Sequence, residues 1–206
     1  MKSRHLFLLI MALVLSANAF GQADSINKRL AKCAAIEGDL ERLECFDQLT
    51  RELGLVATTN TVAVEGSGKW NVRIDSNPLD DSKTVVLVLV ADEGSSQWGR
   101  PVVLIIRCKS NSTEVYITWN DYLGSEARVT TRIGSSKAQS SYWSLSTDSQ
   151  ATFYQDNRIA FVKQLMRADK FVAQVTPYNE SPVTAVFDIR GLSEAIKPLQ
   201  ETCGWE

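Results

Sequence analysis

Histidine is almost absent from this chain: its 206 residues contain one, His5. His5 lies in an N-terminal segment that the sequence predicts to be removed, so the mature protein would have none. Without histidine, the Ser-His-Asp and Cys-His nucleophile systems are excluded. The four cysteines show no CxxC spacing, and with no histidine to complete the ligand set a zinc site is not expected.

Basic runs and phosphate-binding glycine loops are also missing. The formal net charge is −2, and loss of Lys2 and Arg4 would take it to about −4. An acidic chain without a basic cluster argues against nucleic-acid binding, because phosphate neutralisation dominates that affinity. Gly66-Ser67-Gly68-Lys69 lacks the leading glycine spacing of a P-loop. We therefore expect no nucleic-acid partner and no cofactor.

The first 23 residues are typical of a secretory signal. A basic start is followed by an apolar run over residues 6–15 (LFLLIMALVL) and then by small residues up to Ala23. A membrane-spanning helix needs about 20 apolar residues, so this run is short for a retained anchor. Gly21-Gln22-Ala23 provides the small residues that cleavage requires, and Ala17-Asn18-Ala19 is the alternative. We predict a signal peptide over residues 1–23, export, and membrane contact only through the cleaved signal.

The cysteines of the mature chain are even in number, which favours disulfides in an exported protein. They are Cys33, Cys45, Cys108 and Cys203, and three pairings can be drawn. We predict Cys33–Cys45, which closes locally within a short helical unit. We also predict Cys108–Cys203, which would tie the end of the chain to a central strand.

Hydrophobic spacing divides the mature chain into three parts. Residues 24–54 predict a helical hairpin, in which Leu43, Phe46 and Leu49 recur at helical spacing and would pack as a core. Residues 55–68 (LVATTNTVAVEGSG) lack a clear hydrophobic period. Their small residues, threonines and Gly-Ser-Gly end predict a flexible linker.

Strand and turn signals alternate through the third part, residues 69–206, as is typical of an antiparallel sheet or sandwich. One helix is inserted after Asn157, and another begins at Leu192 and closes the chain. The expected fold is therefore α+β, with a disulfide-linked N-terminal helical hairpin followed by a mainly antiparallel, β-sandwich-like domain.

Aromatic side chains are the main candidates for a binding surface. Of the five tryptophans, Trp70 and Trp119 lie on strand patterns and are expected in the core. Trp98 and Trp143 lie in Ser-rich, loop-like surroundings, and aromatic rings on loops can bind sugars or proteins. We therefore predict Trp98 and Trp143 as the candidate binding surface.

Carboxylates and one serine offer the catalytic alternatives. Asp80 and Asp81 could form an acid–base pair of the kind that glycosidases use, although an Asp-Asp pair after Asn77-Pro78 is more typical of a solvated turn. Ser25 and Lys28 have the spacing of a serine–lysine pair, but they lie at an expected helix cap.

Three segments carry a resemblance to a known family. They are KCAAIEGDLERLECFDQL from Lys32, LIIRCKSNSTEVYITWNDYL from Leu104, and AVFDIRGLSEAIKPLQETC from Ala185. In order and spacing, the three together resemble the TagO/VasI family, accessory proteins associated with bacterial type VI secretion. The resemblance implies a periplasmic accessory role in a contractile injection machine, with proteins of that apparatus as partners. It supplies no catalytic residues.

Three functions follow from these observations. The first is a periplasmic accessory protein that acts by binding or assembly and is not an enzyme. The second is a module that binds peptidoglycan or another glycan, and the third is a hydrolase that uses only carboxylates. The family resemblance favours the first.

Overall fold

The computed structural model describes residues 26–53 and 61–206. The predicted signal peptide and Ser25 lie outside the described residues. The chain forms two compact units, one within residues 1–59 and the other within residues 60–206. Within the described ranges, no helix is long and apolar enough to cross a membrane.

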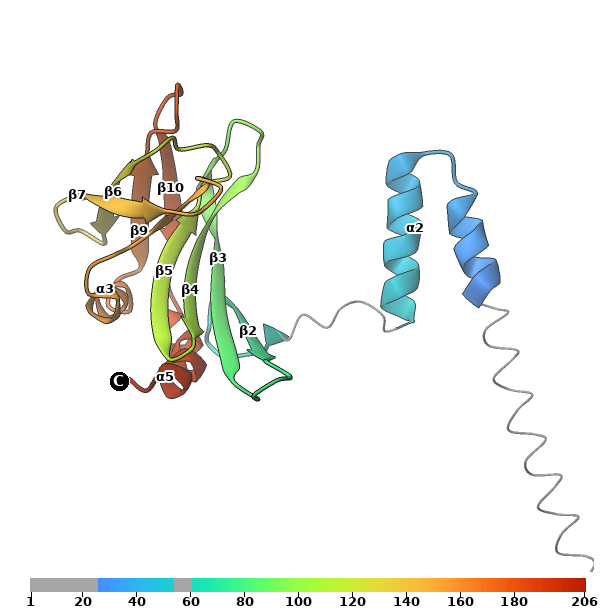
Figure 1. Cartoon of the computed structure of the whole chain (residues 1–206), viewed down its shortest axis with the longest axis horizontal. Coiled ribbons are helices and arrows are strands. Elements are labelled where there is room, and N and C mark those ends of the chain that lie inside the picture. Colours follow the sequence, from blue (N-terminus) through green and yellow to red (C-terminus); the bar gives the residue numbers. More distant parts are fainter. Residues whose placement is uncertain (1–25, 54–60) are drawn as a thin grey trace, which may run out of the picture. The chain divides into compact units, whose positions relative to one another are not determined.

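The N-terminal unit is a helical hairpin (Figure 1). A helix over residues 26–34 is followed, after the turn at Gly38, by α2 (Asp39–Glu52). The predicted Cys33–Cys45 disulfide is confirmed and joins the two helices, with 5.4 Å between its Cα atoms. An ion pair between Arg29 and Glu52 links them further along.

Packing of the two helices in the hairpin leaves part of the apolar surface of α2 exposed. Leu49 is buried, but Leu43 is 60% exposed, so the expectation that Leu43 packs in a core is wrong. An α-helix turns by about 100° per residue, which places Leu43 roughly 200° around α2 from Cys45. Because Cys45 faces the first helix, Leu43 points away from it.

The second unit is a closed antiparallel barrel (Figure 1). Eight strands pair in the cyclic order β3-β10-β9-β6-β7-β8-β5-β4, and pairing of β4 with β3 closes the ring, while β2 and then β1 extend outward from β3. The strands are β1 (Thr61–Val62), β2 (Asn71–Ser76), β3 (Lys83–Ser95), β4 (Pro101–Lys109), β5 (Ser112–Thr118), β6 (Ala127–Ile133), β7 (Gln139–Leu145), β8 (Ala151–Phe153), β9 (Lys170–Val175) and β10 (Val183–Asp188).

The predicted β-sandwich is therefore wrong. Two packed sheets of a sandwich keep separate edges, whereas here β3 pairs with both β4 and β10, and β8 pairs with both β5 and β7. β3 is 13 residues long, and its register with β4 shifts after Val90. This irregularity lets one strand leave the first sheet and join the second, as bulges do at barrel corners.

Gly94 makes the second half of that crossing feasible. Its φ is +99°, and a Cβ at this position would lie 2.4 Å from the Thr184 carbonyl oxygen on β10. Only glycine permits both this backbone conformation and so close an approach of β3 to β10.

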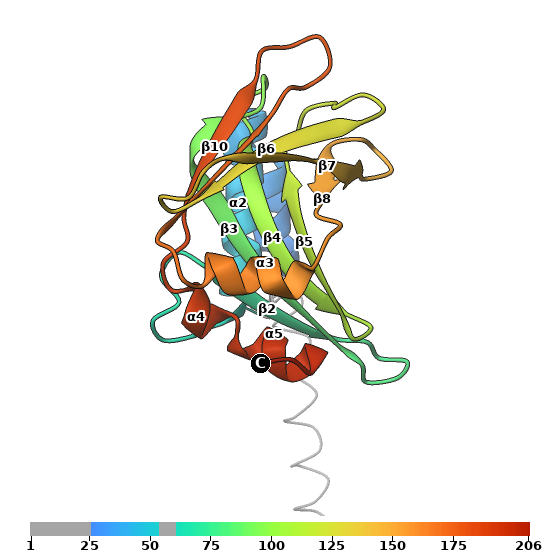
Figure 2. The same ribbon diagram turned by 90° about the vertical axis from the view of Figure 1, so that its left-hand side faces the viewer.

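Three helices complete the core at one end of the barrel (Figure 2). They are α3 (Arg158–Leu165), α4 (Leu192–Ala195) and α5 (Lys197–Cys203). The α3 helix starts where expected, because the Asn157 side chain accepts a hydrogen bond from the Ala160 N–H at 3.0 Å. The predicted closing helix is divided at Ile196, and Pro198 then occupies the first turn of α5, where its missing N–H costs nothing.

The predicted Cys108–Cys203 disulfide is also confirmed, with 5.9 Å between its Cα atoms. It fixes α5 to β4, and both cysteines are buried. Beside it, the Trp205 indole N–H donates to the Thr113 hydroxyl at 2.8 Å. The end of the described chain is thus held against β4 and β5.

Candidate functional site

The β3–β4 turn lies at the upper end of the barrel in Figure 1. It contains Trp98, whose side chain is 75% exposed. The turn beneath it is fixed. The Ser96 N–H donates to the Arg100 carbonyl at 2.8 Å, and the buried Ser96 hydroxyl accepts from the N–H groups of Trp98 and Arg100, both at 3.2 Å. The indole ring of Trp98 is therefore exposed to solvent on a turn that these hydrogen bonds hold in place.

A buried carboxylate connects this turn to the next one. Asp121 follows β5 and is 2% exposed; its Oδ2 accepts from the Gln97 N–H at 3.1 Å. Asn120 adds a second link, since its side-chain amide donates to the Pro101 carbonyl at 2.8 Å. The residues on either side of Trp98 are thus held by the β5–β6 loop.

Two exposed tyrosines lie on the neighbouring loops of the same end. Tyr122 follows Asp121, and Tyr178 lies in the β9–β10 turn; they are 56% and 61% exposed. Their rings meet edge to face with centroids 5.9 Å apart, and the Tyr178 N–H donates to the Tyr122 carbonyl at 2.9 Å. We call the three loops that carry Trp98, Tyr122 and Tyr178 the aromatic loops.

Trp143, the other predicted binding residue, lies in the core. It is 4% exposed, and its ring packs edge to face against Tyr154 and Phe161. Its strand, β7, has the sequence QSSYWSL, in which Ser140, Tyr142 and Ser144 face outward. Trp143 faces inward on the same side as Ser141, to whose hydroxyl its indole N–H donates at 3.2 Å. Trp143 therefore presents no binding surface in this fold. Trp70 and Trp119 are buried, as expected.

The candidate catalytic carboxylates lie in a turn. Asp80 and Asp81 belong to the β2–β3 turn, where the Asp80 carboxylate accepts from the Ser82 N–H at 3.0 Å. Hydrogen bonds from Ser82 lower the pKa of Asp80, which favours its ionised form. A carboxyl group held ionised in an exposed turn is unsuited to act as a general acid. Of the serine–lysine pair, Ser25 lies outside the described residues.

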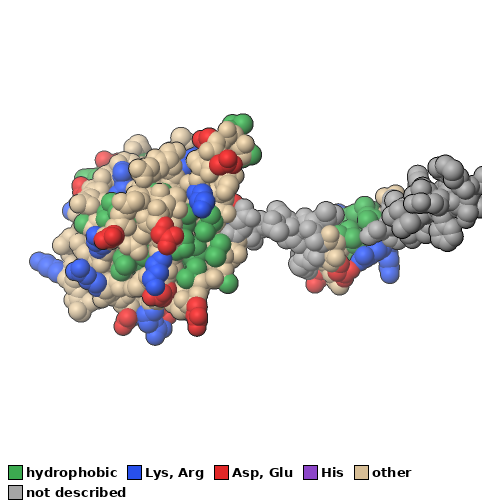
Figure 3. Space-filling model, turned by 90° about the horizontal axis from the view of Figure 1, so that it is seen from below, with side chains coloured by type: hydrophobic (Ala, Val, Ile, Leu, Met, Phe, Trp, Pro, Cys, Tyr) green, Lys and Arg blue, Asp and Glu red, His purple; other side chains and the backbone are tan. Residues whose placement is uncertain are grey.

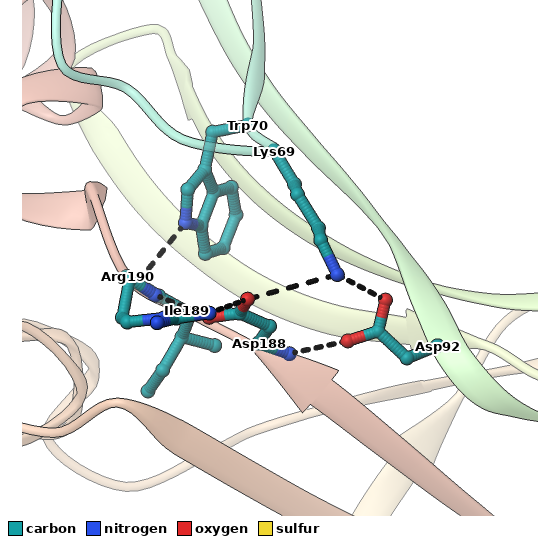
Figure 4. A network of polar contacts seen from close by, with 6 residues as sticks. All are labelled: Lys69, Trp70, Asp92, Asp188, Ile189 and Arg190. Atoms are coloured by element: carbon teal, nitrogen blue, oxygen red, sulfur yellow. Dashed lines mark hydrogen bonds and ion pairs between the residues drawn. The ribbon is translucent and has the colours of Figure 1, made fainter.

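Four charged side chains form a cluster where the chain enters β2 and leaves β10 (Figure 4). Arg190 donates to both carboxylate oxygens of Asp188, at 2.7 and 2.5 Å. Lys69 Nζ lies 2.7 Å from Asp92 Oδ1 and 3.6 Å from Asp188 Oδ2. Two cations thus balance two carboxylates, and we call Lys69, Asp92, Asp188 and Arg190 the charged cluster.

Pairing holds three members of the charged cluster, Lys69, Asp188 and Arg190, in their ionised forms. The hydrogen bonds from Arg190, with the charges of Arg190 and Lys69, place the pKa of Asp188 well below its usual range. Asp188 in turn raises the pKa of Arg190, and Asp92 raises the pKa of Lys69. Since none of these three shifts moves a group toward neutral pH, the cluster is poorly suited to proton transfer.

The cluster fastens the segment before β2 to the segment after β10. Beside it, the Trp70 indole N–H donates to the Ile189 carbonyl at 3.3 Å. A Cβ on Gly68 would lie 2.4 Å from the Arg190 carbonyl oxygen, and one on Gly191 would lie 2.6 Å from the Gly66 carbonyl oxygen. The glycines that suggested a flexible segment are therefore tightly packed here.

Comparison with protein families identifies the chain. A family model described as "Type VI secretion system VasI, EvfG, VC_A0118" matches residues 32–205. The chain belongs to the VasI family. No curated protein matches it. Among solved structures, it is similar to invasion associated protein B from Bartonella henselae, with 14% identity and a TM-score of 0.47, over 68% of this chain and 97% of that chain.

The VasI match contains all four cysteines, the aromatic loops and the charged cluster. This VasI-family chain is therefore a type VI secretion-associated protein, as its sequence segments suggested. The sequence pointed to Trp98 as a candidate but not to Tyr122 or Tyr178, which the structure also places exposed on loops. A signal for them did exist, since each tyrosine is next to a turn-forming residue, Asp121 or Asn179, rather than within an alternating strand pattern.

Surface charge on the barrel is mixed. On the face seen in Figure 3, Lys and Arg side chains are interspersed with Asp and Glu. Ion pairs between such side chains in the described part of the second unit include Lys69–Asp92, Lys69–Asp188, Arg107–Glu114, Arg190–Asp188 and Lys197–Glu194. Such a surface offers no basic stripe for a phosphate backbone on this face.

Proposed function

We propose that this VasI-family protein is a periplasmic accessory protein of a type VI secretion system, and that it binds a protein component of the apparatus through the aromatic loops. The observation that carries the proposal is Trp98, a 75% exposed indole on a turn anchored by the buried carboxylate of Asp121. The family places the chain with type VI secretion.

The aromatic loops have the properties of a hot spot, the small group of residues that contributes most of the binding energy in a protein interface. Trp and Tyr are enriched among the residues whose truncation costs most binding energy. Ordering a mobile loop on binding costs free energy, and a turn that is already hydrogen-bonded avoids most of this cost. The links from Asp121 and Asn120 provide that pre-organisation.

A periplasmic location agrees with the two disulfides. Disulfides persist in oxidising compartments such as the bacterial periplasm and are rare in the cytosol. The Cys108–Cys203 bridge closes a loop between residues 95 positions apart, and a long closed loop gives the largest expected stabilisation. Export through the predicted signal peptide would deliver the chain to the compartment where these bridges form.

Binding rather than catalysis is supported by the state of the charged side chains. Asp188, Arg190 and Lys69 are paired in their ionised forms, and Asp80 lies in an exposed turn. None of these groups is placed with a partner whose pKa is moved toward neutral pH, which is the arrangement that acid–base catalysis uses.

Crosslinking in cells tests the proposal. The wild-type protein, at native expression, should recover a secretion-system component after crosslinking and pull-down. Trp98→Ala should reduce this recovery about tenfold or more, which corresponds to about 1.4 kcal/mol. Leu79→Ala is the matched control, because Leu79 is a 91% exposed apolar residue on the β2–β3 turn, away from the aromatic loops. Recovery of no secretion component by the wild type, or equal recovery by Trp98→Ala, would overturn the proposal.

A further inference from the structure

A second surface lies on the outer face of β6, β7 and β9. It is a hollow of about 470 Å³, a volume within the range of about 300–1,000 Å³ found for small-molecule sites. Its lining includes Glu126, Arg128, Thr130, Ser140, Tyr142 and Gln174. We call it the sheet-face hollow.

A row of hydroxyl and amide groups crosses the floor of the sheet-face hollow. Thr130 on β6 lies opposite Ser140 on β7 and Gln174 on β9, and Gln174 lies opposite Thr184 on β10. Neighbouring strands are about 4.8 Å apart, so four strands extend this row over about 14 Å.

The row is hydrogen-bonded in two pairs and keeps capacity for more. The Thr130 and Ser140 hydroxyl oxygens are 2.7 Å apart, and the Gln174 amide donates to the Thr184 hydroxyl at 2.7 Å. Each hydroxyl has one donor and two acceptor positions, and the glutamine amide has two donors and a carbonyl. The internal bonds fix these side chains, and by this count the Gln174 carbonyl and the hydroxyl lone pairs keep capacity for further hydrogen bonds.

An aromatic ring stands next to the polar row. Tyr142, two residues along β7 from Ser140, is 64% exposed, and its cross-strand neighbour on β6 is Arg128. A tyrosine offers an apolar ring face together with a polar tip. The Arg128 guanidinium adds planar donors that suit paired oxygen acceptors, and the Glu126 carboxylate adds acceptors at the same side of the hollow.

The combination matches the chemistry of a sugar chain. An oligosaccharide needs many donors and acceptors for its hydroxyl groups and a flat ring for its apolar C–H face. A protein partner would need an apolar centre, and five of the six lining residues named above are polar or charged, with Tyr142 as the one ring among them. We propose that the sheet-face hollow binds an oligosaccharide, with Tyr142 as the stacking platform and Thr130, Ser140 and Gln174 as hydroxyl-binding groups.

This site goes beyond the proposed function. Trp98 does not line the sheet-face hollow, so protein binding through the aromatic loops and sugar binding through the hollow can fail separately. Polymers of the cell wall and soluble polysaccharides both present chains of hydroxylated rings, and the choice of probes distinguishes these two sources.

Titration of the mature protein, with both disulfides formed, tests the proposal. The probes are a soluble N-acetylglucosamine tetramer, a soluble glucose tetramer and insoluble purified peptidoglycan. Binding of the two soluble tetramers is measured by calorimetry, and binding of peptidoglycan is measured by co-sedimentation. Wild-type binding to at least one probe is expected. Tyr142→Ala and Gln174→Ala should each weaken it about tenfold or more, while Tyr142→Phe should retain most of it because the ring remains.

Trp98→Ala is the matched control for these variants, because it removes an exposed aromatic residue outside the hollow and should leave sugar binding unchanged. Near-ultraviolet circular dichroism verifies that each variant is folded. Binding to peptidoglycan and the N-acetylglucosamine tetramer alone would identify the cell wall as the source, and equal binding to the glucose tetramer would identify polysaccharide in general. Failure of the wild type to bind any of the three probes would overturn the proposal, and so would equal binding by the wild type and both folded variants, Tyr142→Ala and Gln174→Ala.

Discussion

The carboxylate of Asp121 accepts a hydrogen bond from the backbone N–H of Gln97 at 3.1 Å, across 24 residues of sequence. Asp121 is buried, and Gln97 directly precedes the most exposed tryptophan of the barrel, Trp98. This contact joins the β3–β4 turn to the β5–β6 loop and so determines where Trp98 stands. The binding surface that we propose therefore depends on a residue that is itself buried.

Replacing Asp121 with Ala should loosen the turn that carries Trp98. The Gln97 N–H would lose its acceptor in a part-buried hydrogen bond, and such a bond contributes about 0.5–1.5 kcal/mol of stability. We expect urea unfolding to show a loss of this size. Amide hydrogen exchange at Gln97 should become faster, and recovery of the secretion component should fall as it does for Trp98→Ala.

Asp121→Asn is the control for this effect, because its side-chain oxygen can still accept one hydrogen bond. It should lose less stability than Asp121→Ala and keep Gln97 protected. Unchanged exchange at Gln97 in Asp121→Ala would show that the carboxylate does not hold the turn.

The two disulfides should stabilise different units. In the loop-entropy model, the Cys108–Cys203 bridge, with a sequence separation of 95, contributes about 4–5 kcal/mol, and the Cys33–Cys45 bridge, with a separation of 12, about 3 kcal/mol. Replacing Cys108 and Cys203 with Ser should therefore lower the urea midpoint of the barrel. Replacing Cys33 and Cys45 should instead unfold the hairpin and leave the barrel unchanged.

Tryptophan fluorescence separates these outcomes. All five tryptophans lie between residues 70 and 205, in the second unit, so their emission reports on the barrel alone. Helical signal in far-ultraviolet circular dichroism reports on the hairpin as well. A shift of the fluorescence midpoint after loss of Cys33–Cys45 would contradict the independence of the two units.

The strands of the barrel could be predicted from the sequence where they consist of a continuous run of apolar residues. Continuous β-branched and aliphatic residues marked the positions of β3 and β4, and the capping residue Asn157 marked the start of α3. Local signals of this kind do not depend on which strands become neighbours.

Closure of the barrel could not be predicted, because it depends on β7 and β8. β7 contains three serines and a glutamine among its seven residues, and Trp143 is its one fully buried side chain, so its composition resembles a loop. β8 has three residues, too few for a periodic pattern. Without these two strands the predicted sheets had open edges, which led to a sandwich and placed Trp143 on the surface.

The charged cluster illustrates a different limit. Lys69 lies 23 residues from Asp92, and Asp188 lies 96 residues from Asp92, so no sequence spacing relates them. Their meeting is a consequence of the pairing of β3 with β10. Sequence alone could only identify each as a charged residue near a turn.

Acid should weaken the barrel partly through Asp188. Its pKa is well below the usual range, first because Arg190 donates hydrogen bonds to it and then because of the charges of Arg190 and Lys69. A carboxyl group whose pKa is lowered by folding stabilises the fold above its unfolded pKa of about 4, and this contribution is lost as pH falls through the folded pKa. Asp188→Asn should therefore lose less stability than the wild type below about pH 4, as measured by urea midpoints across a pH series.

Arg190→Gln provides the complementary measurement. It removes the largest cause of the shift, so the pKa of Asp188 should rise toward its usual value in a carboxyl NMR titration. Lys69→Gln should raise it less, since Lys69 Nζ lies 3.6 Å from the carboxylate whereas Arg190 donates to it directly. Equal effects of the two variants would show that Arg190 is not the dominant partner.

Gly94, where β3 meets β10, should be highly sensitive to replacement by alanine. Alanine there would have to adopt a φ of +99° and place its Cβ 2.4 Å from the Thr184 carbonyl oxygen and 2.9 Å from the Ala185 Cα. The positive φ alone costs about 1–3 kcal/mol, and the backbone contact cannot be relieved by moving a flexible side chain. Gly204→Ala is the matched control, since its φ is +64° but no atom lies within 4 Å of the added Cβ, so it should cost only about 1–2 kcal/mol. Urea unfolding followed by tryptophan fluorescence measures both, and a Gly94→Ala cost no larger than that of Gly204→Ala would mean that β3 can cross to β10 without the close approach on which we base the closure of the barrel.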